Sequence, residues 1–387
     1  MLWSVRRGEV GAAVRAVLVV GAGFAGAVHA RELAEAGWPV QVIDRRVHLA
    51  GTAYDWVDAT GTRRHAYGPH LFHTRNARVM AWLCRFGAFL PYELRVRALV
   101  EGLGCLPLPI NRTTINAVFG LMLRDAAEVA AFLASEALPC AAPRNAAEHL
   151  HARVGVRLTN LFYRPYSTKM WGRPLERLDP EVVARVPIRH DDEDRYFLDA
   201  PFQLLPRDGY VALIAAILDH PSIRVSTGTA FDPAMLAEHE ACFTSMAIDE
   251  FYGACHGPLP YRSLRFHHRE VECDYGLGET ALVTFTDPSP YTRQTDWSRL
   301  PGHRVGRGAR KTVTLEEPCD SRDNGDERFY PVRDRASDAL YRQYAALAER
   351  DPKLRFIGRC GTYRYLDMDQ VINQSLHGVR KWIREHG

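Results

Sequence analysis

The chain has 387 residues, of which 47% are hydrophobic and 25% are charged, and its formal net charge is +3 at pH 7. This length predicts two or three domains, and the balanced charge excludes a whole-protein field for nucleic acid or a membrane surface. The 8 cysteines form no C-x-x-C pair and match no zinc spacing, so we expect buried thiols and no metal site. No apolar run reaches the roughly 18 residues of a membrane-spanning helix and no cleavable leader is recognisable, so we expect a cytoplasmic protein.

The first predicted unit is a βαβ motif. Residues 17–20 are a short β-branched run typical of a buried parallel strand. Residues 27–36 predict a helix that ends at Gly37, and residues 40–43 predict a second strand. This is the usual length of a nucleotide-binding unit.

Later segments predict helices first and then alternating strands. Residues 115–138 and 145–161 are rich in residues that favour helices, and residues 201–218 predict a turn followed by a helix. The other predicted elements are strands of antiparallel type at 265–271, 281–285 and 312–315, a loop at 298–310, a helix at 336–350, a strand at 354–357 and a closing helix at 370–385.

The turn after the first strand carries glycines in the spacing G-x-G-x-x-G, at Gly21, Gly23 and Gly26. The first glycine permits a tight turn, the second lets a pyrophosphate approach the backbone, and the third lets helix and strand pack closely. Asp44, at the end of the second strand, can accept hydrogen bonds from both ribose hydroxyls of an adenosine. We therefore expect a bound dinucleotide.

Two arginines, Arg45 and Arg46, directly follow this acid. An arginine there can bind the 2′-phosphate of an NADP, but with Asp44 present a structural or exposed role is the simpler interpretation. The C-terminal residues 361–369 are dense in hydroxyls and carboxylates. Together with the glycine turn, they indicate a cofactor held by both ends of the chain, as in flavoproteins.

Two histidines, His70 and His73, stand three residues apart. No other ligands with matched spacing are nearby, so zinc is not expected. The pair is either structural or places a neutral imidazole beside a flavin, where it would tune the electronics of the ring.

Aromatic side chains alternate with basic and hydroxyl residues in residues 162–171 and recur around Tyr196, Arg293 and Tyr330. Arginine forks grip phosphate, tyrosines offer hydroxyls, and a tryptophan face packs on a sugar ring. Each residue alone is more often structural, but the joint pattern indicates a site for a phosphorylated, ring-shaped ligand.

Six segments of the chain carry a resemblance to a known family. The chain resembles the bacterial UDP-galactopyranose mutases, a family of flavoenzymes, over about residues 17–378. The segments that carry the resemblance are H-x-Y-G-x-H-x-F-H-T at 65–74, Y-S-x-K-x-W at 166–171, A-R-V-P-I-R at 184–189, P-Y-T-R at 290–293, Y-P-V at 330–332 and G-R-x-G-T-Y-R-Y-L-D-M-D at 358–369.

The resemblance implies a reaction on a nucleotide-diphosphate hexose that is UDP-galactose-like. Reduced FAD is the cofactor, with NAD(P)H or another reductant supplying the electrons once, and the reaction has no net redox change. The flavin N5 attacks the anomeric carbon and displaces the diphosphate, the sugar ring opens on the flavin, and reclosure through another hydroxyl gives the furanose. The relatives form oligomers, which makes a homodimer an expectation of the same kind.

The glycine motif and the resemblance together assign roles to individual residues. Catalytic roles fall to Arg185, Arg293 and His73, with the two arginines on the diphosphate. Substrate contacts fall to Phe162, Tyr163, Tyr166, Trp171, Tyr196, Tyr330 and Tyr365. Cofactor contacts fall to Gly21, Gly23, Phe24, Gly26, Asp44, Arg45, Thr52, His70, Leu71, Arg359, Asp367, Met368 and Asp369.

The resemblance also implies an α/β fold in which a discontinuous Rossmann-like FAD-binding domain is interrupted by a helical insertion and an antiparallel β-sheet domain. The expected boundaries are 1–80, 202–250 and 335–387 for the FAD-binding domain, 111–185 for the helical domain, and 81–110, 186–201 and 251–334 for the sheet domain.

The chain departs from the family pattern at positions expected near the sugar and the base. Leu90, Leu94 and Thr284 stand where the family has asparagines, and its E-H-K becomes residues 296–298, Asp-Trp-Ser. A loss of amide hydrogen bonds indicates either drift, or an altered substrate such as a GDP-linked hexose or a deoxyhexose.

Two other functions fit the same cofactor motif. A flavin oxidoreductase of the amine-oxidase type would share the glycine turn and the acid, but needs no arginines for a diphosphate. A non-catalytic flavoprotein would bind a nucleotide sugar without isomerising it.

Overall fold

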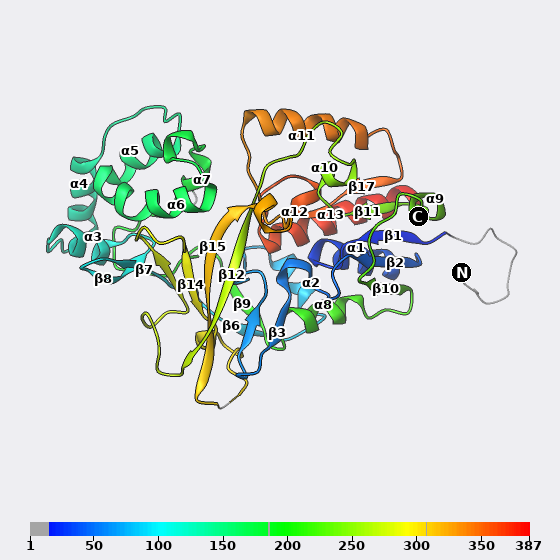
Figure 1. Cartoon of the computed structure of the whole chain (residues 1–387), viewed down its shortest axis with the longest axis horizontal. Coiled ribbons are helices and arrows are strands. Elements are labelled where there is room, and N and C mark those ends of the chain that lie inside the picture. Colours follow the sequence, from blue (N-terminus) through cyan, green and yellow to red (C-terminus); the bar gives the residue numbers. More distant parts are fainter. Residues whose placement is uncertain (1–14, 185, 307) are drawn as a thin grey trace, which may run out of the picture.

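The computed structural model describes residues 15–184, 186–306 and 308–387. Figure 1 shows a lobe of helices on one side of a long twisted sheet and a second, helix-covered sheet on the other side.

A parallel sheet is assembled from distant stretches of the chain. Its order is β10-β2-β1-β11-β17, and every neighbouring pair is parallel. β1 is buried along its whole length, as a central parallel strand with the sequence Val-Leu-Val-Val should be. The five strands are β1 (Val17–Val20), β2 (Val40–Asp44), β10 (Ile223–Thr227), β11 (Cys242–Thr244) and β17 (Leu354–Phe356).

The first and last described elements of the chain pack together on this sheet. The predicted N-terminal helix is α1 (Phe24–Glu35), which packs against α8 (Tyr210–Leu218) and α13 (Met368–His386). Buried residues of these three helices and of β1 belong to one hydrophobic core, so the C-terminal helix closes over the glycine turn that begins the chain.

The second large sheet has the order β16-β12-β15-β14-β13-β7-β8. All its pairs are antiparallel except β13 with β7, which run parallel, so the sheet is mixed. Its longest pair is β12 with β15, matched from Arg262 opposite Asp320 to Glu272 opposite Arg310. The strands are β7 (Val96–Val100), β8 (Gly104–Leu108), β12 (Tyr261–Glu272), β13 (Leu282–Phe285), β14 (Arg293–Asp296), β15 (Arg310–Asp320) and β16 (Tyr330–Pro331).

The helical lobe begins its helices with side-chain caps. Asn111, Asp125 and Asn145 each accept a hydrogen bond from the backbone N–H three residues later, which fixes the starts of three helices. The helices are α3 (Arg112–Phe119), α4 (Ala126–Glu136), α5 (Ala146–Leu158), a π-helical turn (Thr159–Tyr163), α6 (Arg164–Trp171) and α7 (Glu181–Ala184).

Two small sheets lie between the large ones. In one of them, β9 replaces the turn that was predicted near residue 201, because residues 202–206 pair with both β5 and β6. The strands are β3 (Asp55–Val57), β4 (Arg63–His65), β5 (Phe72–Thr74), β6 (Phe89–Pro91) and β9 (Phe202–Pro206).

The remaining elements are short helices and one long surface helix, α11, that matches the helix predicted at 336–350. They are α2 (Ala77–Leu83), α9 (Met235–Glu238), α10 (Ile248–Phe251), α11 (Arg335–Ala348) and α12 (Gly358–Gly361), with 3-10 turns at Gly51–Ala53, Leu175–Arg177, Trp297–Arg299 and Ser321–Asn324. Across the described ranges, no helix combines the length and the apolar character needed to cross a bilayer.

Candidate functional site

The glycine turn joins β1 to α1, and its backbone lies very close to neighbouring atoms. Gly21 has φ +108°, and a Cβ built on it would lie 2.0 Å from Ser245 Oγ. A Cβ on Gly26 would lie 1.8 Å from the carbonyl oxygen of Gly21. Neither position tolerates a side chain, so the turn has the shape that lets a pyrophosphate approach the N-terminus of α1.

Asp44 lies at the carboxyl end of β2, beside this turn. Its Oδ2 accepts the backbone N–H of Ala22 at 2.8 Å, and its Oδ1 accepts that of Arg46 at 2.8 Å. Each carboxylate oxygen keeps a further lone pair, so Asp44 can brace the turn and also accept ribose hydroxyls.

Arg45 makes ion pairs with Glu250 at 3.2 Å and Glu327 at 3.8 Å, and its side chain is 49% exposed. These ion pairs support a structural role for Arg45, and its predicted cofactor contact stays a prediction. Thr52 lies exposed in the 3-10 turn Gly51–Ala53, and a Cβ on Gly51 would lie 3.2 Å from Gly23 Cα. The turn around residue 52 thus packs directly on the glycine turn.

The histidine segment runs from β4 into β5. The Nδ1–H of His70 donates to the Gly68 carbonyl at 2.8 Å. Burial, together with Arg359 and Arg293, lowers the pKa of His70 to about 4, against the opposing effect of the Gly68 bond. A neutral imidazole is thus held beside two cations. His73 stacks on Phe197 with ring centroids 3.6 Å apart and an interplanar angle of 11°.

The C-terminal run encloses the same region. Arg359 donates to the Leu366 carbonyl at 3.0 Å from Nε, and its guanidinium lies 5.5 Å from the ring centre of Tyr330 and 5.0 Å from that of Tyr365. These two tyrosine rings stack with centroids 5.7 Å apart. Cation–π contacts and ring stacking hold Tyr330, Tyr365 and Arg359 in place, and they do not neutralise the charge of Arg359.

Two of the residues predicted at the cofactor, Asp367 and Asp369, lie at the start of α13. Asp367 caps this helix, and Asp369 accepts a hydrogen bond from the Thr74 hydroxyl at 2.9 Å. Thr74 belongs to β5, so the C-terminal segment is tied to the histidine segment.

Arg293 is held by a carboxylate that the sequence patterns did not single out. Its Nε lies 3.0 Å from Oε1 and its Nη2 lies 2.7 Å from Oε2 of Glu316, the residue directly opposite on β15. The Glu316 side chain is 1% exposed. Burial by itself lowers the pKa of Arg293, but Glu316, Tyr166 and Tyr330 together raise it above its usual value, so this guanidinium stays charged.

Three predicted tyrosines surround this ion pair. Burial raises the pKa of Tyr166 and Tyr330, while Arg293 opposes the rise in both. Tyr365 influences both hydroxyls as well. Tyr166 and Tyr330 therefore remain neutral phenols, which can donate hydrogen bonds, beside a fixed cation.

The predicted residues of the helical lobe split into two groups. Phe162 and Tyr163 belong to the π-helical turn and to the core of the lobe, at 5% and 6% exposure. The Tyr163 hydroxyl is buried and has no partner among the described residues, which is unusual for a buried polar group and consistent with a ligand contact. Trp171 is half-buried and shares an apolar cluster with Tyr166 and Tyr330.

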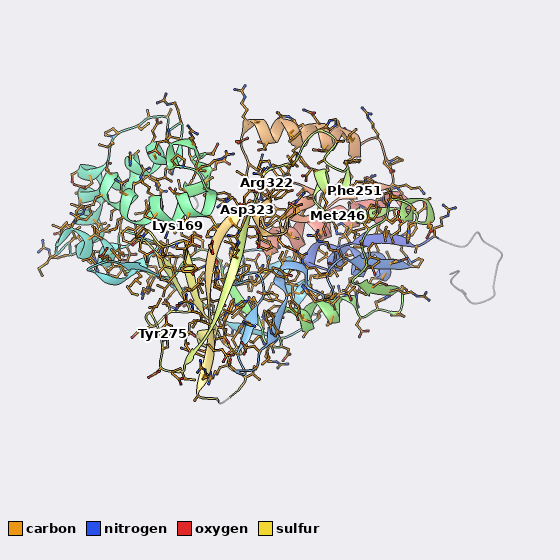
Figure 2. All side chains as sticks on the ribbon, in the orientation of Figure 1. Lys169, Met246, Phe251, Tyr275, Arg322 and Asp323 are labelled. Carbon is orange, nitrogen blue, oxygen red and sulfur yellow. The ribbon has the colours of Figure 1, made fainter. Side chains whose placement is uncertain are left out.

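The lobe is fastened to the sheet from the same helix. Figure 2 shows Lys169 on the side of α6 nearest the strands, where its Nζ donates to the Tyr291 carbonyl at 2.9 Å. Tyr291 lies two residues before Arg293. The polar residues of the Y-S-x-K-x-W segment therefore serve the positioning of the site as well as its lining.

Tyr196 lies beside Leu94 and Phe197. Its N–H donates to the Leu94 carbonyl at 2.7 Å, and its ring meets Phe197 edge-on at 5.0 Å. Arg185, the other predicted catalytic arginine, lies outside the described residues.

The three positions that depart from the family pattern are not open polar positions. Leu94 is 6% exposed and packs in an apolar cluster with Trp297. The Thr284 hydroxyl donates to the Arg97 carbonyl at 3.2 Å, and Leu90 approaches Gly302. Tyr196 and Phe197 pack against the same cluster, so the wall behind His73 is apolar.

Comparison with known proteins identifies the family. A sequence profile described as GLF, UDP-galactopyranose mutase, matches residues 161–365, and one described as an NAD(P)-binding Rossmann-like domain matches residues 19–86. A Klebsiella pneumoniae protein named "Probable UDP-galactopyranose mutase" is 35% identical over 93% of this chain and 92% of its own length. A dTDP-fucopyranose mutase of Escherichia coli is 34% identical over 96% of this chain and 99% of its own.

The chain belongs to the UDP-galactopyranose mutase family. It is accordingly a pyranose–furanose mutase, an enzyme of the isomerase class. A crystal structure of reduced UDP-galactopyranose mutase has the same fold, with a TM-score of 0.75 at 17% identity, and covers 96% of this chain and 94% of its own. The predicted family and fold class are confirmed.

In this mutase-family chain the residues present fit a dinucleotide cofactor. The glycine turn excludes side chains at Gly21 and Gly26, and α1 as described has neither an acidic residue in its first turn nor a side-chain cap. Its N-terminus can therefore receive an anion. Among the described residues, no group of three or more His, Cys, Asp and Glu side chains could hold a metal ion.

Glu316 and Phe197 are the site residues that sequence reasoning missed. The signal for Glu316 was a charged residue directly after the strand predicted at 312–315; only the structure shows that it is buried. Phe197 follows a predicted tyrosine, but only the fold shows that it stacks on His73.

Proposed function

We propose that this enzyme interconverts the pyranose and furanose forms of a nucleotide-diphosphate hexose, with the diphosphate held at Arg293. The observation that carries this assignment is the fixed cation of Arg293, which is bound to buried Glu316 and surrounded by phenols of Tyr166 and Tyr330. A leaving diphosphate needs a cation that does not titrate, together with hydrogen-bond donors on its oxygens.

The cofactor in this proposal is FAD, bound by Gly21, Gly23, Phe24, Gly26 and Asp44 on one side and by Arg359 and residues 367–369 on the other. When reduced and bound there, it would supply the nucleophile that takes the sugar from its diphosphate and returns it, with no net redox change. His70 stays neutral at the site because burial and Arg359 disfavour its cation. His73, stacked on Phe197, gives the sugar a flat wall.

A deoxyhexose donor is the second candidate. Leu94 and Trp297 form an apolar cluster behind Phe197, and the Thr284 hydroxyl is already bound to a backbone carbonyl. Such a wall offers few partners for sugar hydroxyls and favours a sugar with fewer of them. The relative named dTDP-fucopyranose mutase is nearly as similar to this chain as the one named for UDP-galactopyranose.

A donor screen tests the function. The reduced protein is incubated with UDP-galactopyranose, dTDP-fucopyranose and a GDP-hexose, and the nucleotide sugars are separated by chromatography. We expect a furanose product without consumption of oxidant. No furanose from any donor would contradict the proposal, and stoichiometric oxidation of the donor would favour the amine-oxidase type of chemistry instead. Furanose from the GDP-hexose alone would select the guanosine-linked substrate predicted from the sequence.

The position of the diphosphate is tested at Arg293. Arg293→Ala should lower kcat by about 10²–10³-fold while leaving the flavin bound, because a preorganised cation at the leaving group is lost. Arg293→Lys is the matched control, since it keeps a charge but not the two-pronged contact with Glu316. Steady-state kinetics and flavin absorbance measure both effects, and an unchanged kcat in the alanine variant would place the diphosphate elsewhere.

A further inference from the structure

Two buried histidines, His65 and His303, form a pair directly behind the site. His65 ends β4 and His303 lies in the loop before β15, 238 positions away. Their Nε2 atoms are 3.0 Å apart, and the two side chains are 0% and 2% exposed. Neither residue was assigned a role above, and neither lies at the Arg293 ion pair.

The hydrogen-bond partners fix the proton positions in this pair. The backbone N–H of His70 donates to Nδ1 of His65 at 3.0 Å, so that nitrogen carries no proton and the neutral ring is protonated on Nε2. Nδ1 of His303 lies 3.0 Å from the Pro301 carbonyl, which can only accept, so it carries the proton and Nε2 of His303 is the acceptor. The chain of hydrogen bonds therefore runs from His70 through His65 to His303.

This chain of hydrogen bonds from His70 to His303 cannot take up an additional proton without losing one of its bonds. A proton added to Nδ1 of His65 faces the N–H of His70. A proton added to Nε2 of His303 makes that atom a donor, and His65 can then accept it only by moving its own proton to Nδ1, again facing His70. Either event removes the acceptor of the His70 amide, and a buried amide without a partner costs about 1–3 kcal/mol.

The surroundings keep the pair neutral. Burial, together with His303, His70 and Arg63, lowers the pKa of His65 well below its usual range, against the opposing effect of the Gly68 carbonyl. Burial also lowers the pKa of His303, against the opposing effects of Pro301 and Asp55. The charged and titratable groups that face the pair are Arg63 and Asp55, which are ion-paired at 3.3 Å, together with His70 and Tyr210.

A second buried side chain holds the other side of His70. The Tyr210 hydroxyl donates to the His70 carbonyl at 2.8 Å, and Tyr210 is 1% exposed. The ring of His70 is turned by its own bond to the Gly68 carbonyl. Both peptide groups of His70 are thus bound by buried side chains, and its remaining nitrogen, Nε2, is left unprotonated.

We propose that His65 and His303 act as a coupled pair of positioning residues that hold His70 in place in the site, with His303 setting the tautomer of His65. The inference rests on the proposed function, in which His70 forms part of the wall of the cofactor site. His303 acts entirely through His65. It affects His70 only by keeping the proton of His65 on Nε2, which leaves Nδ1 free to accept the His70 amide.

Matched substitutions separate this role from simple packing. His65→Leu removes the acceptor of the His70 amide, whereas His65→Asn places a carbonyl oxygen near the position of Nδ1. His303→Leu removes the acceptor for His65, whereas His303→Gln places a carbonyl oxygen near the position of Nε2. His239→Leu serves as a control, because His239 is another buried histidine, but its hydrogen bonds go to Met235 and Gln41 and not to the pair or to His70.

Hydrogen exchange of the peptide containing the His70 amide, on the flavin-loaded protein, is the first measurement. We expect about fivefold or faster exchange in both leucine variants, since a hydrogen bond of about 1 kcal/mol is lost, and near-normal exchange in the asparagine, glutamine and control variants. We expect kcat to fall in the leucine variants, with KM changing less, and to recover in the rescuing variants. Unchanged exchange at His70 in His303→Leu would overturn the proposal, as would equal acceleration in leucine and rescuing variants.

A second measurement covers leucine variants that fail to fold. Imidazole nitrogen NMR of the unmutated protein should show the proton on Nε2 of His65 and on Nδ1 of His303, and the opposite tautomers or a charged ring would overturn the proposal. The two hypotheses fail separately. A protein that makes no furanose but shows the expected exchange and tautomers contradicts the mutase function alone, whereas an active protein with the wrong tautomers contradicts the positioning role alone.

Discussion

At the scale of single residues, the site is governed by one buried ion pair. Arg293 and Glu316 meet through two parallel hydrogen bonds at the end of a strand pair, and Glu316 is almost completely buried. A buried pair of this kind adds little net stability, but removing one partner leaves an uncompensated charge. Its clearest use here is to fix the direction of the guanidinium while leaving part of the fork free for phosphate oxygens.

Glu316→Gln tests this at the residue scale. The amide keeps the size of the side chain but loses the charge, so Arg293 should be held less firmly and kcat should fall by about tenfold, the equivalent of about 1.4 kcal/mol in the barrier. Steady-state kinetics on the reduced protein measure the change. Glu317→Gln is the matched control, because Glu317, the next residue on β15, binds Arg265 and His267 instead of Arg293. An equal loss in both variants would mean that the strand, not the ion pair, was disturbed.

At the scale of elements, helix ends and strand ends position the cofactor side of the site. The turn between β1 and α1 leaves no room for side chains at Gly21 and Gly26, and the start of α13 brings Asp369 to the histidine segment. The site is thus built where a parallel strand ends and where two helices begin, as is usual for dinucleotide sites in α/β proteins.

Gly26→Ala tests the glycine turn. Its Cβ would lie 1.8 Å from the Gly21 carbonyl oxygen, so the turn must shift and we expect a protein that no longer retains flavin. Gly378→Ala, in α13, is the matched control. The nearest atom to its Cβ is 4.0 Å away, and alanine should stabilise the helix by about 0.5–1 kcal/mol. Flavin absorbance after purification measures the flavin content of both variants. Full flavin content in Gly26→Ala would show that the turn is not the cofactor site.

At the scale of the whole molecule, the N-terminal helix α1 and the C-terminal helix α13 are bound to each other through polar contacts. Glu32 on α1 accepts the Trp82 indole N–H at 2.6 Å and the Arg380 Nε–H at 2.6 Å, which joins α1, α2 and α13. Thr74 and Asp369 add a second link. Closure of the cofactor site and folding of the C-terminal helix are therefore coupled events.

Buried neutral histidines give the molecule a defined acid sensitivity. Burial lowers the pKa of His29 and of His70 from 6.5 to about 4. Between these values the unfolded chain binds protons that the folded protein does not, so the free energy of unfolding should fall as pH drops from about 6.5 to about 4, by up to about 1.4 kcal/mol per pH unit for each histidine. Denaturant unfolding at pH 7, 6 and 5 measures this, and His29→Gln should reduce the slope. Stability that rises on acidification would contradict the burial of these groups as neutral rings.

Local patterns were sufficient for much of the fold. The run of residues 17–20, the glycine spacing and Asp44 predicted the βαβ unit, because hydrophobic period and glycine sterics are local properties. The turn predicted near residue 201 was wrong, since β9 forms only by pairing with β5 and β6. The expected domain boundaries and the individual roles of the site residues stay predictions.

The sequence by itself determined the family, the fold class and the dinucleotide turn, because these depend on short contiguous motifs. Sterics and hydrogen bonding within each motif require its residue spacing. Only the tertiary structure decided which groups meet. Glu316 faces Arg293 through strand register, Phe197 covers His73, and His303 reaches His65 across 238 positions. Such contacts depend on how sheets and loops are brought together by burial of the core, and no local pattern encodes them.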